Sequence, residues 1–249
     1  MTIHYHGGPI WGDKTVSYKE LMPALWRGGG ALVSYAYPDQ LKQIVNIPCS
    51  LILDNGAFTD WKRDKKANKN RDWDAHWKGY YDKMVGPWFS RIEWFLIPDK
   101  IEGTEEENDA LVAAVPPWLK SKAVPVWHSD ESIARFVRLC KEFPRVAIGC
   151  CGESRAIRSK AWVKRMDQAF IAIYAARNLK TKIHGLRMLD GRALSKYPFD
   201  SADSSSVATN VPKTDKVVPE ITCKLARTAV LRAAKEIVVP PTVAEWLDM

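Results

Sequence analysis

Short apolar runs alternate with longer amphipathic stretches from one end of the chain to the other. The runs contain mostly Val, Ile, Leu, Ala, Phe and Trp, and they are continuous rather than alternating, which is typical of strands buried on both faces. The pattern predicts strands at 31–35, 50–53, 94–97, 123–127, 146–149, 183–188 and 198–201. Because both faces of each strand must be covered, the sheet is predicted to be parallel.

The stretches between these runs follow the period of an α-helix. Apolar residues from Ile133 to Cys140 recur at i, i+3, i+4 and i+7, and a second stripe spans 162–176. A last helix is predicted at 219–237, because Pro219 suits a first helical turn and Pro240 ends the segment.

Seven or eight strand–helix units in 249 residues are the dimensions of a (β/α)8 barrel of the TIM type, in one domain over residues 1–249. A doubly wound open sheet is the alternative. No G-x-G-x-x-G or P-loop motif follows an early strand, and Gly28-Gly29-Gly30 precedes a strand as a turn. No run approaches the roughly 20 apolar residues of a membrane span, and the N-terminus lacks the layout of a secretory signal. A cytoplasmic protein is therefore expected.

Charge indicates a polyanionic partner. The net charge is +8 and the pI about 9.2, which favours nucleic acid among binding partners. A basic insertion around 61–72 is poor in aliphatic residues, and we interpret it as a loop that rises from the carboxyl rim of the barrel to bind phosphates. Its candidate nucleic-acid-binding residues are Lys62, Arg63, Lys65, Lys66, Lys69 and Arg71.

Acidic residues stand where predicted apolar strands end. Asp54 follows 51–53, Asp99 follows 94–97, and Asp200 and Asp203 follow the last strand. The carboxyl ends of barrel strands surround one pocket, and two or three carboxylates in one pocket suit chemistry at a glycosidic bond. A single aspartate at such a position is more often a helix cap, so the prediction rests on all of them together.

Five segments resemble the tRNA-guanine transglycosylases. Asp54-Asn55-Gly56-Ala57-Phe58 is similar to their Asp-Ser-Gly-Gly-Phe strand end, and Asp99 resembles their base-recognising acid. Residues 147–153 resemble their glycine-rich base-binding turn, 183–187 a glycine-containing strand, and 200–206 the segment with the nucleophilic aspartate. The chain lacks the Cys-x-Cys-x-x-Cys…His zinc site and an added RNA-binding domain. In this it is more similar to the compact branch, found with phages and bacterial islands, that places 7-deazaguanines in DNA.

The resemblance implies an exchange of guanine for a 7-deazaguanine base, in DNA in preference to tRNA. It implies that the reaction needs no cofactor and no metal. It also implies a location in the host cytoplasm if the protein is phage-encoded. It implies Asp203 as the nucleophile that forms a glycosyl-aspartate, Asp54 as the proton-handling residue, and Asp200 as a competing nucleophile. The base-binding residues that we predict are Asp99, Asn55, Gly56, Phe58, His128, Gly149, Cys150, Gly152, His184 and Gly185.

Two other functions are compatible with the sequence. The spacing His4-x-His6 on a first strand, together with a strand-end aspartate, suits a metal-dependent amidohydrolase-like barrel. A barrel that binds nucleic acid or partner subunits without catalysis would retain the basic segment and have no use for the carboxylates.

Overall fold

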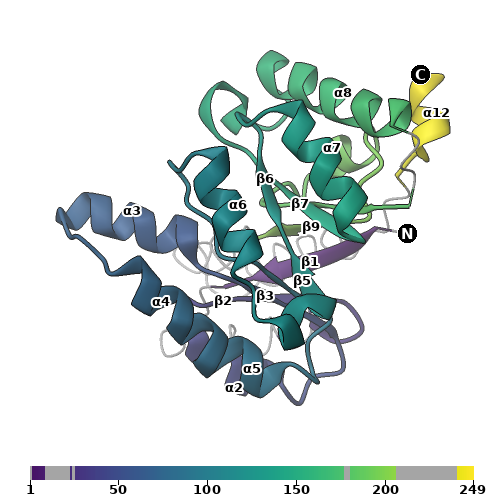
Figure 1. The fold of residues 1–249 in the computed structure, drawn as a ribbon. Coiled ribbons are helices and arrows are strands. Elements are labelled where there is room, and N and C mark those ends of the chain that lie inside the picture. Colours follow the sequence, from purple (N-terminus) through teal and green to yellow (C-terminus); the bar gives the residue numbers. More distant parts are fainter. Residues whose placement is uncertain (1, 9–22, 24–25, 177–179, 206–239) are drawn as a thin grey trace, which may run out of the picture.

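The chain forms a closed ring of parallel strands surrounded by helices (Figure 1). The computed structural model describes residues 2–8, 23, 26–176, 180–205 and 240–249. The predicted helix at 219–237 lies outside these residues. In the described part of the chain the strands are β1 (Ile3–Gly7), β2 (Gly30–Ser34), β3 (Ser50–Asp54), β4 (Trp94–Leu96), β5 (Ala123–Val124), β6 (Val126–His128), β7 (Arg145–Gly149), β8 (Lys182–Gly185) and β9 (Ser201–Ser204).

The strand order shows that the fold is a (β/α)8 barrel, as predicted, and not an open sheet. The order is β5-β4-β3-β2-β1-β9-β8-β7-β6, with every pairing parallel. The two ends, β5 and β6, are consecutive segments separated only by Pro125, so together they occupy one position and close the ring. Pro125 has no N–H to donate, which divides the strand predicted at 123–127 into two. Its carbonyl still accepts a hydrogen bond from the Ala147 N–H at 2.9 Å.

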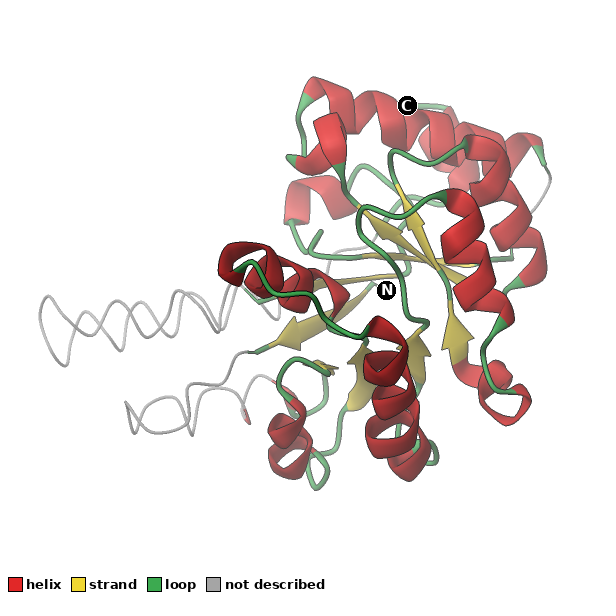
Figure 2. Cartoon of the chain, turned by 60° about the vertical axis from the view of Figure 1, so that its left-hand side comes forward, coloured by secondary structure: helices red, strands yellow, loops and turns green. Residues whose placement is uncertain are grey.

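Helices cover the outside of the ring, as the second view shows (Figure 2). Figure 1 shows α7 beside α8, and the short C-terminal α12 packs on α8. The predicted helical stripes correspond to α7 and α8. The helices are α2 (Leu41–Ile44), α3 (Ala57–Ala67), α4 (Trp73–Tyr80), α5 (Gly86–Trp88), α6 (Glu105–Ala113), α7 (Ile133–Glu142), α8 (Lys160–Ala175), α9 (Gly191–Leu194) and α12 (Val243–Leu247). Among the described residues, no helix is long and apolar enough to cross a membrane.

Alternation along each strand determines which side chains face the barrel interior. Tyr5, Leu32, Ile52, Trp94 and Val126 form one buried cluster inside the ring. Their strand neighbours pack instead in two clusters between sheet and helices. By the same period of two, the side chains of Asp54, His128, His184 and Asp203 point inward.

Several elements differ from the prediction, and two of these differences bear on the site. The basic segment at 61–72 is not a loop: most of it belongs to helix α3, which Figure 1 shows at the edge of the barrel. Asp60 and Asp64 on this helix are buried, and Arg71 contacts both, with its Nε 2.5 Å from an Asp64 oxygen. The last strand begins at Ser201 rather than ending there. Phe199 is buried in the outer core before the strand starts.

Candidate functional site at the carboxyl rim

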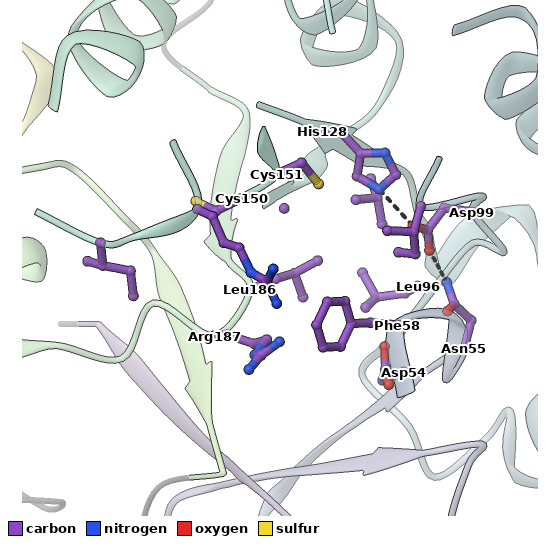
Figure 3. Close-up of a pocket in the computed structure, with 15 residues that line it drawn as sticks. Asp54, Asn55, Phe58, Leu96, Asp99, His128, Cys150, Cys151, Leu186 and Arg187 are labelled. Atoms are coloured by element: carbon purple, nitrogen blue, oxygen red, sulfur yellow. Dashed lines mark hydrogen bonds and ion pairs between the residues drawn. The ribbon is translucent and has the colours of Figure 1, made fainter. Parts of the chain in front are cut away.

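Two adjoining cavities lie at the carboxyl end of the strands. One has a volume of about 310 Å³ and is lined by Asp99, and we call it the Asp99 cavity (Figure 3). The other has a volume of about 420 Å³, is lined by Asp203, and is called the Asp203 cavity. Both are lined by Asp54, Phe58, Leu186 and Arg187, so the two cavities share a wall. This is the end of a (β/α)8 barrel where active sites lie.

Asp203 is held through one oxygen only. Its Oδ1 accepts hydrogen bonds from the Arg187 backbone N–H at 2.8 Å and from His184 Nε2 at 3.3 Å. Below it, His184 Nδ1 lies 2.8 Å from the hydroxyl of Ser201. Burial lowers the pKa of His184, so the neutral imidazole is favoured, and this network assigns its proton to Nε2. Among the described residues, no side chain or backbone group donates to Oδ2, which leaves this oxygen able to react.

Asp54, at the end of β3, lies on the shared wall between the other two carboxylates. Burial raises the pKa of Asp54 to about 7, and the nearby charges of Asp203 and Asp99 act in the same direction. Hydrogen bonds from Ser34 and from the Gly56 N–H, at 3.2 Å, oppose this change. A carboxyl group with a pKa near neutrality can both give and take a proton at physiological pH.

Asp99 is fixed through both oxygens, as the dashed lines in Figure 3 show. Asn55 donates to Oδ1 at 2.6 Å, and His128 Nε2 lies 2.7 Å from Oδ2. Asn55 is itself positioned by a second donated bond, at 2.7 Å, to the carbonyl of Ile97. Each oxygen keeps a lone pair for a ligand, so the group can accept hydrogen bonds from N–H groups in the cavity.

A buried charged network supports His128 from behind. Glu131 accepts hydrogen bonds from the His128 backbone N–H at 2.8 Å, from Asn108 at 3.1 Å and from Arg135 at 2.5 Å. Although burial acts to lower the pKa of His128, the hydrogen bond to Asp99 and the charges of Asp99 and Glu131 outweigh it and raise this pKa. Neither Glu131 nor Arg135 was among the predicted site residues. Their i, i+4 spacing was the available signal.

Two arginines that were not among the predicted site residues, Arg155 and Arg187, also line the Asp99 cavity. The Arg187 guanidinium lies 4.4 Å from the centre of the Phe58 ring, and that of Arg155 lies 6.0 Å from the same ring. Arg187 has a backbone φ of 58°, an uncommon conformation for a residue with a side chain. This conformation accompanies the hydrogen bond from its N–H to Asp203.

Most predicted base-binding residues line the Asp99 cavity. Asn55, Phe58, His128, Gly149 and Cys150 do so together with Asp99, and Cys151 joins them. A side chain at Gly149 would be closely confined, because an added Cβ would lie 3.2 Å from the His128 ring. Burial raises the pKa of Cys150 to about 11 and that of Cys151 to about 12, so neither thiol ionises readily at neutral pH.

Four other predicted residues do not line either cavity. His184 is fully buried beneath Asp203, and Gly185 faces outward, where an added Cβ would lie 2.9 Å from Met188. Gly152 is exposed in the turn after Cys151. Gly56 begins helix α3 with a φ of 79°, where an added Cβ would lie 2.8 Å from the Ala36 nitrogen. Its role in the described structure is to turn the chain after Asp54.

Asp200 cannot act as the competing nucleophile in this cavity. It precedes β9, where its carboxylate accepts a bond from the Ile183 N–H at 2.8 Å and its carbonyl accepts one from Ile3 at 3.0 Å. Both partners lie at the amino ends of their strands, on the rim opposite the cavities. The prediction of Asp200 as an alternative was wrong because the strand starts later than expected.

The basic residues of the predicted insertion fall into two groups. Lys62, Arg63 and Lys66 line the Asp203 cavity. Lys65 is bound instead to Glu102 at 2.8 Å, and Arg71 is held by the buried carboxylates of α3. Lys69 lines neither cavity. Only the first group therefore has access to a ligand in the site.

The metal site predicted from His4 and His6 is contradicted by strand alternation. Tyr5 points into the barrel, so the two histidines on either side of it point to the outer face of β1. Another group could hold an ion: His128, Asp130 and Cys151 have potential ligand atoms within 4.8 Å of one another. His128 Nε2 in this group is already hydrogen-bonded to Asp99.

The fold and site together define a (β/α)8 barrel with three carboxylates at its carboxyl rim. No protein-family model matches the chain, and no curated protein matches it. Among solved structures, it is similar to tryptophan synthase from M. tuberculosis, with a TM-score of 0.48 and 10% identity over 94% of this chain and 93% of that chain. It is also similar to the tryptophan synthase A-subunit of Pyrococcus furiosus, with a TM-score of 0.46 and 9% identity over 100% and 98%. Likeness at this level carries no information about activity.

Proposed function

We propose that the chain is a base-exchange transglycosylase that replaces guanine in nucleic acid, with DNA favoured over tRNA, by a 7-deazaguanine derivative. The observation that carries the proposal is the convergence of three carboxylates, from β9, from β3 and from the turn after β4, on two cavities that share Asp54. Glycosidic bond chemistry needs this combination: one carboxylate to attack the anomeric carbon and another to move the proton.

In the first step, Asp203 Oδ2 attacks C1′ of the target nucleoside. The C1′–N9 bond breaks, its electron pair passes to N9 of the departing guanine, and protonated Asp54 supplies the proton. A covalent glycosyl-aspartate remains. The position of Asp203 supports this role, because it lines the cavity and its Oδ1 is held by Arg187 and His184, while Oδ2 has no donor among the described residues.

In the second step, the incoming base gives its N9 proton to the Asp54 carboxylate. N9 attacks C1′, the C1′–Oδ2 bond breaks, and the carboxylate of Asp203 is restored. Two inversions retain the configuration at C1′. The pKa of about 7 at Asp54 suits a residue that acts as an acid in one step and a base in the next.

The two cavities divide the nucleoside between them in this proposal. The Asp99 cavity takes the base, whose N–H edge is recognised by the Asp99 carboxylate. The Asp203 cavity takes the sugar, and Lys62, Arg63 and Lys66 on its border contact the adjoining phosphates. Such contacts would offset the few kcal/mol needed to take a base out of the stack.

A covalent-trapping experiment tests the proposal. The protein is incubated with duplex DNA, single-stranded DNA or tRNA, with and without a free 7-deazaguanine base, and analysed on a denaturing gel and by nucleoside mass spectrometry. We expect an adduct and a modified nucleoside with one polymer, both lost in Asp203→Asn and retained in Asp200→Asn, whose side chain faces the opposite rim. Neither adduct nor exchange on any polymer would contradict the proposal.

A metal-dependent hydrolase is the second candidate, and the group His128, Asp130 and Cys151 is the observation that favours it. This candidate predicts bound zinc or a similar ion in the purified protein and a hydrolytic activity that a chelator removes.

A non-catalytic nucleic-acid-binding barrel would instead show no turnover, and Asp203→Asn would leave its affinity for nucleic acid unchanged.

A further inference from the structure

The Asp99 cavity has an acidic wall and a basic wall. One wall carries Asp99, bound by Asn55 and His128. In the view of Figure 3, Arg187 lies on the opposite side, with Phe58 between them. Arg155 also lines this cavity, and both guanidinium groups lie over the Phe58 ring, at 4.4 and 6.0 Å from its centre.

The charges of these two arginines are not compensated within the described residues. Neither Arg155 nor Arg187 forms an ion pair with a described carboxylate, whereas Lys65, Arg71 and Arg135 all do. A guanidinium group offers five N–H donors in a planar arrangement that matches a carboxylate or a phosphate. Two of them on one cavity wall form a binding surface for an anion.

We infer that Arg155 and Arg187 form an anion-binding wall that selects an incoming base carrying a negatively charged substituent, such as a carboxylate. The inference rests on the proposed function and specifies its substrate. Asp99 would bind the N–H edge of the planar base, and the arginines would bind a charged group on the opposite side of the ring. A cationic substituent would be repelled by the same wall.

The position of Arg155 favours a charged base over a backbone phosphate as the source of the anion. Arg187 lines both cavities, but Arg155 lines only the Asp99 cavity. The lysines that suit phosphates, Lys62 and Lys66, line the other one. An anion that contacts both arginines must therefore lie in the cavity that also contains Asp99, which is where the proposal places the base.

Direct binding of three free bases tests the inference without requiring turnover. The probes are 7-carboxy-7-deazaguanine, the neutral 7-cyano-7-deazaguanine and the cationic 7-aminomethyl-7-deazaguanine, each measured by isothermal titration calorimetry. We expect the carboxylate to bind at least about tenfold more tightly than the neutral base, as for one charge-assisted hydrogen-bonded pair. The cationic base should bind most weakly.

The variants Arg155→Gln, Arg187→Gln and their combination should reduce this preference stepwise towards equal affinities. Lys164→Gln is the matched control, because it removes one positive charge from an exposed position on α8, outside both cavities. It should leave the ratio unchanged. Equal reductions in all four variants would mean that net charge, rather than this wall, sets the preference, and would overturn the inference.

Exchange assays on the same samples separate this inference from the proposed function. Exchange with equal affinity for the three bases would overturn the anion-binding wall and leave the transglycosylase standing. An arginine-dependent preference for the carboxylate without any exchange would support the wall and contradict the activity. If the arginines instead bind backbone phosphates, each single variant should lower the slope of log K for DNA binding against log salt by about one. The preference among the three bases should then be unchanged. That result would also overturn the inference.

Discussion

The two carboxylates on opposite sides of Asp54 are held in different ways. Asp99 is bound through both oxygens, by Asn55 and His128, and a buried network of Glu131, Asn108 and Arg135 stands behind it. Asp203 is bound through Oδ1 only. A carboxylate fixed on both oxygens is suited to recognise a ligand, since its geometry is set in advance, whereas one with an uncommitted oxygen is suited to form a bond. We call the side of the site that contains Asp99 the recognition wall and the side that contains Asp203 the reactive wall.

The largest effect is expected at the reactive wall. Asp203→Asn keeps an oxygen for the Arg187 N–H but removes the nucleophile, so kcat for base exchange should fall by at least about 10³-fold. Asp200→Asn, three residues earlier and just before β9, should change kcat less than about twofold, because its side chain lies on the opposite rim. Comparable losses in the two variants, measured by nucleoside mass spectrometry at saturating base, would mean that the reactive wall is wrongly assigned.

At the recognition wall, Glu131→Gln tests whether the buried network sets Asp99 in place. Arg135 and His128 would lose a charged partner in a buried position, and the Gln amide N–H₂ would face donors, so the free energy of unfolding should fall by about 3 kcal/mol. The KM for the free base should rise more than kcat falls. Glu142→Gln removes an exposed carboxylate 3.9 Å from Arg138 and should change neither quantity measurably. A stable Glu131→Gln protein with unchanged KM would show that the network does not act on the site.

Between the walls, Asp54 makes the stability of the protein depend on pH. Its pKa is raised in the folded state from 3.8 to about 7, so its contribution to stability is complete below the lower value and is lost as the pH rises through the higher one. Asp54→Asn removes this loss. The variant should therefore gain on the order of 4 kcal/mol relative to the native protein between pH 4 and pH 8, because the pKa difference is about three tenfold steps in proton affinity and each step corresponds to about 1.4 kcal/mol.

Urea denaturation at these two pH values measures this gain. Asp39→Asn is the control, because the side chain of Asp39 is 91% exposed and its removal should leave the pH dependence unaltered. Parallel profiles for Asp54→Asn and the native protein would place the carboxyl group in a more solvated environment than the structure indicates.

The barrel itself could be predicted because its strands are apolar on both faces. Runs such as 50–53 and 146–149 were located to within a residue or two, since a continuous apolar segment this short is typical of a strand in a parallel sheet covered on both faces. The acidic residues at their ends could then be assigned to one rim. Asp54, Asp99 and Asp203 followed from this argument, and the family resemblance supplied their roles, which remain predictions.

The errors have physical causes in the same region. The last strand, Ser201–Ser204, is polar because its inward side chains belong to the site, while the apolar residues before it pack outside the strand. Helix α3 is stabilised by the buried Asp60 and Asp64 with Arg71, a pattern that hydrophobic periodicity does not detect. Arg155 and Arg187 carry no sequence signal, because both are exposed arginines and nothing in the sequence distinguishes those beside a cavity from the others until the fold is known.

The smallest expected effect is on DNA affinity, and it distinguishes two neighbouring lysines on α3. Lys66 lines the Asp203 cavity, whereas Lys65 is bound to Glu102 at 2.8 Å and stacks 4.8 Å from the Trp61 ring centre. If the reactive wall also borders the path of the nucleic acid, Lys66→Gln should weaken DNA binding about three- to tenfold at low salt and lower the slope of log K against log salt by about 0.9. Lys65→Gln should change the affinity less than about twofold. Fluorescence anisotropy with a labelled duplex over a salt series measures both, and equal effects would indicate that α3 acts through its overall charge rather than through the cavity that it borders.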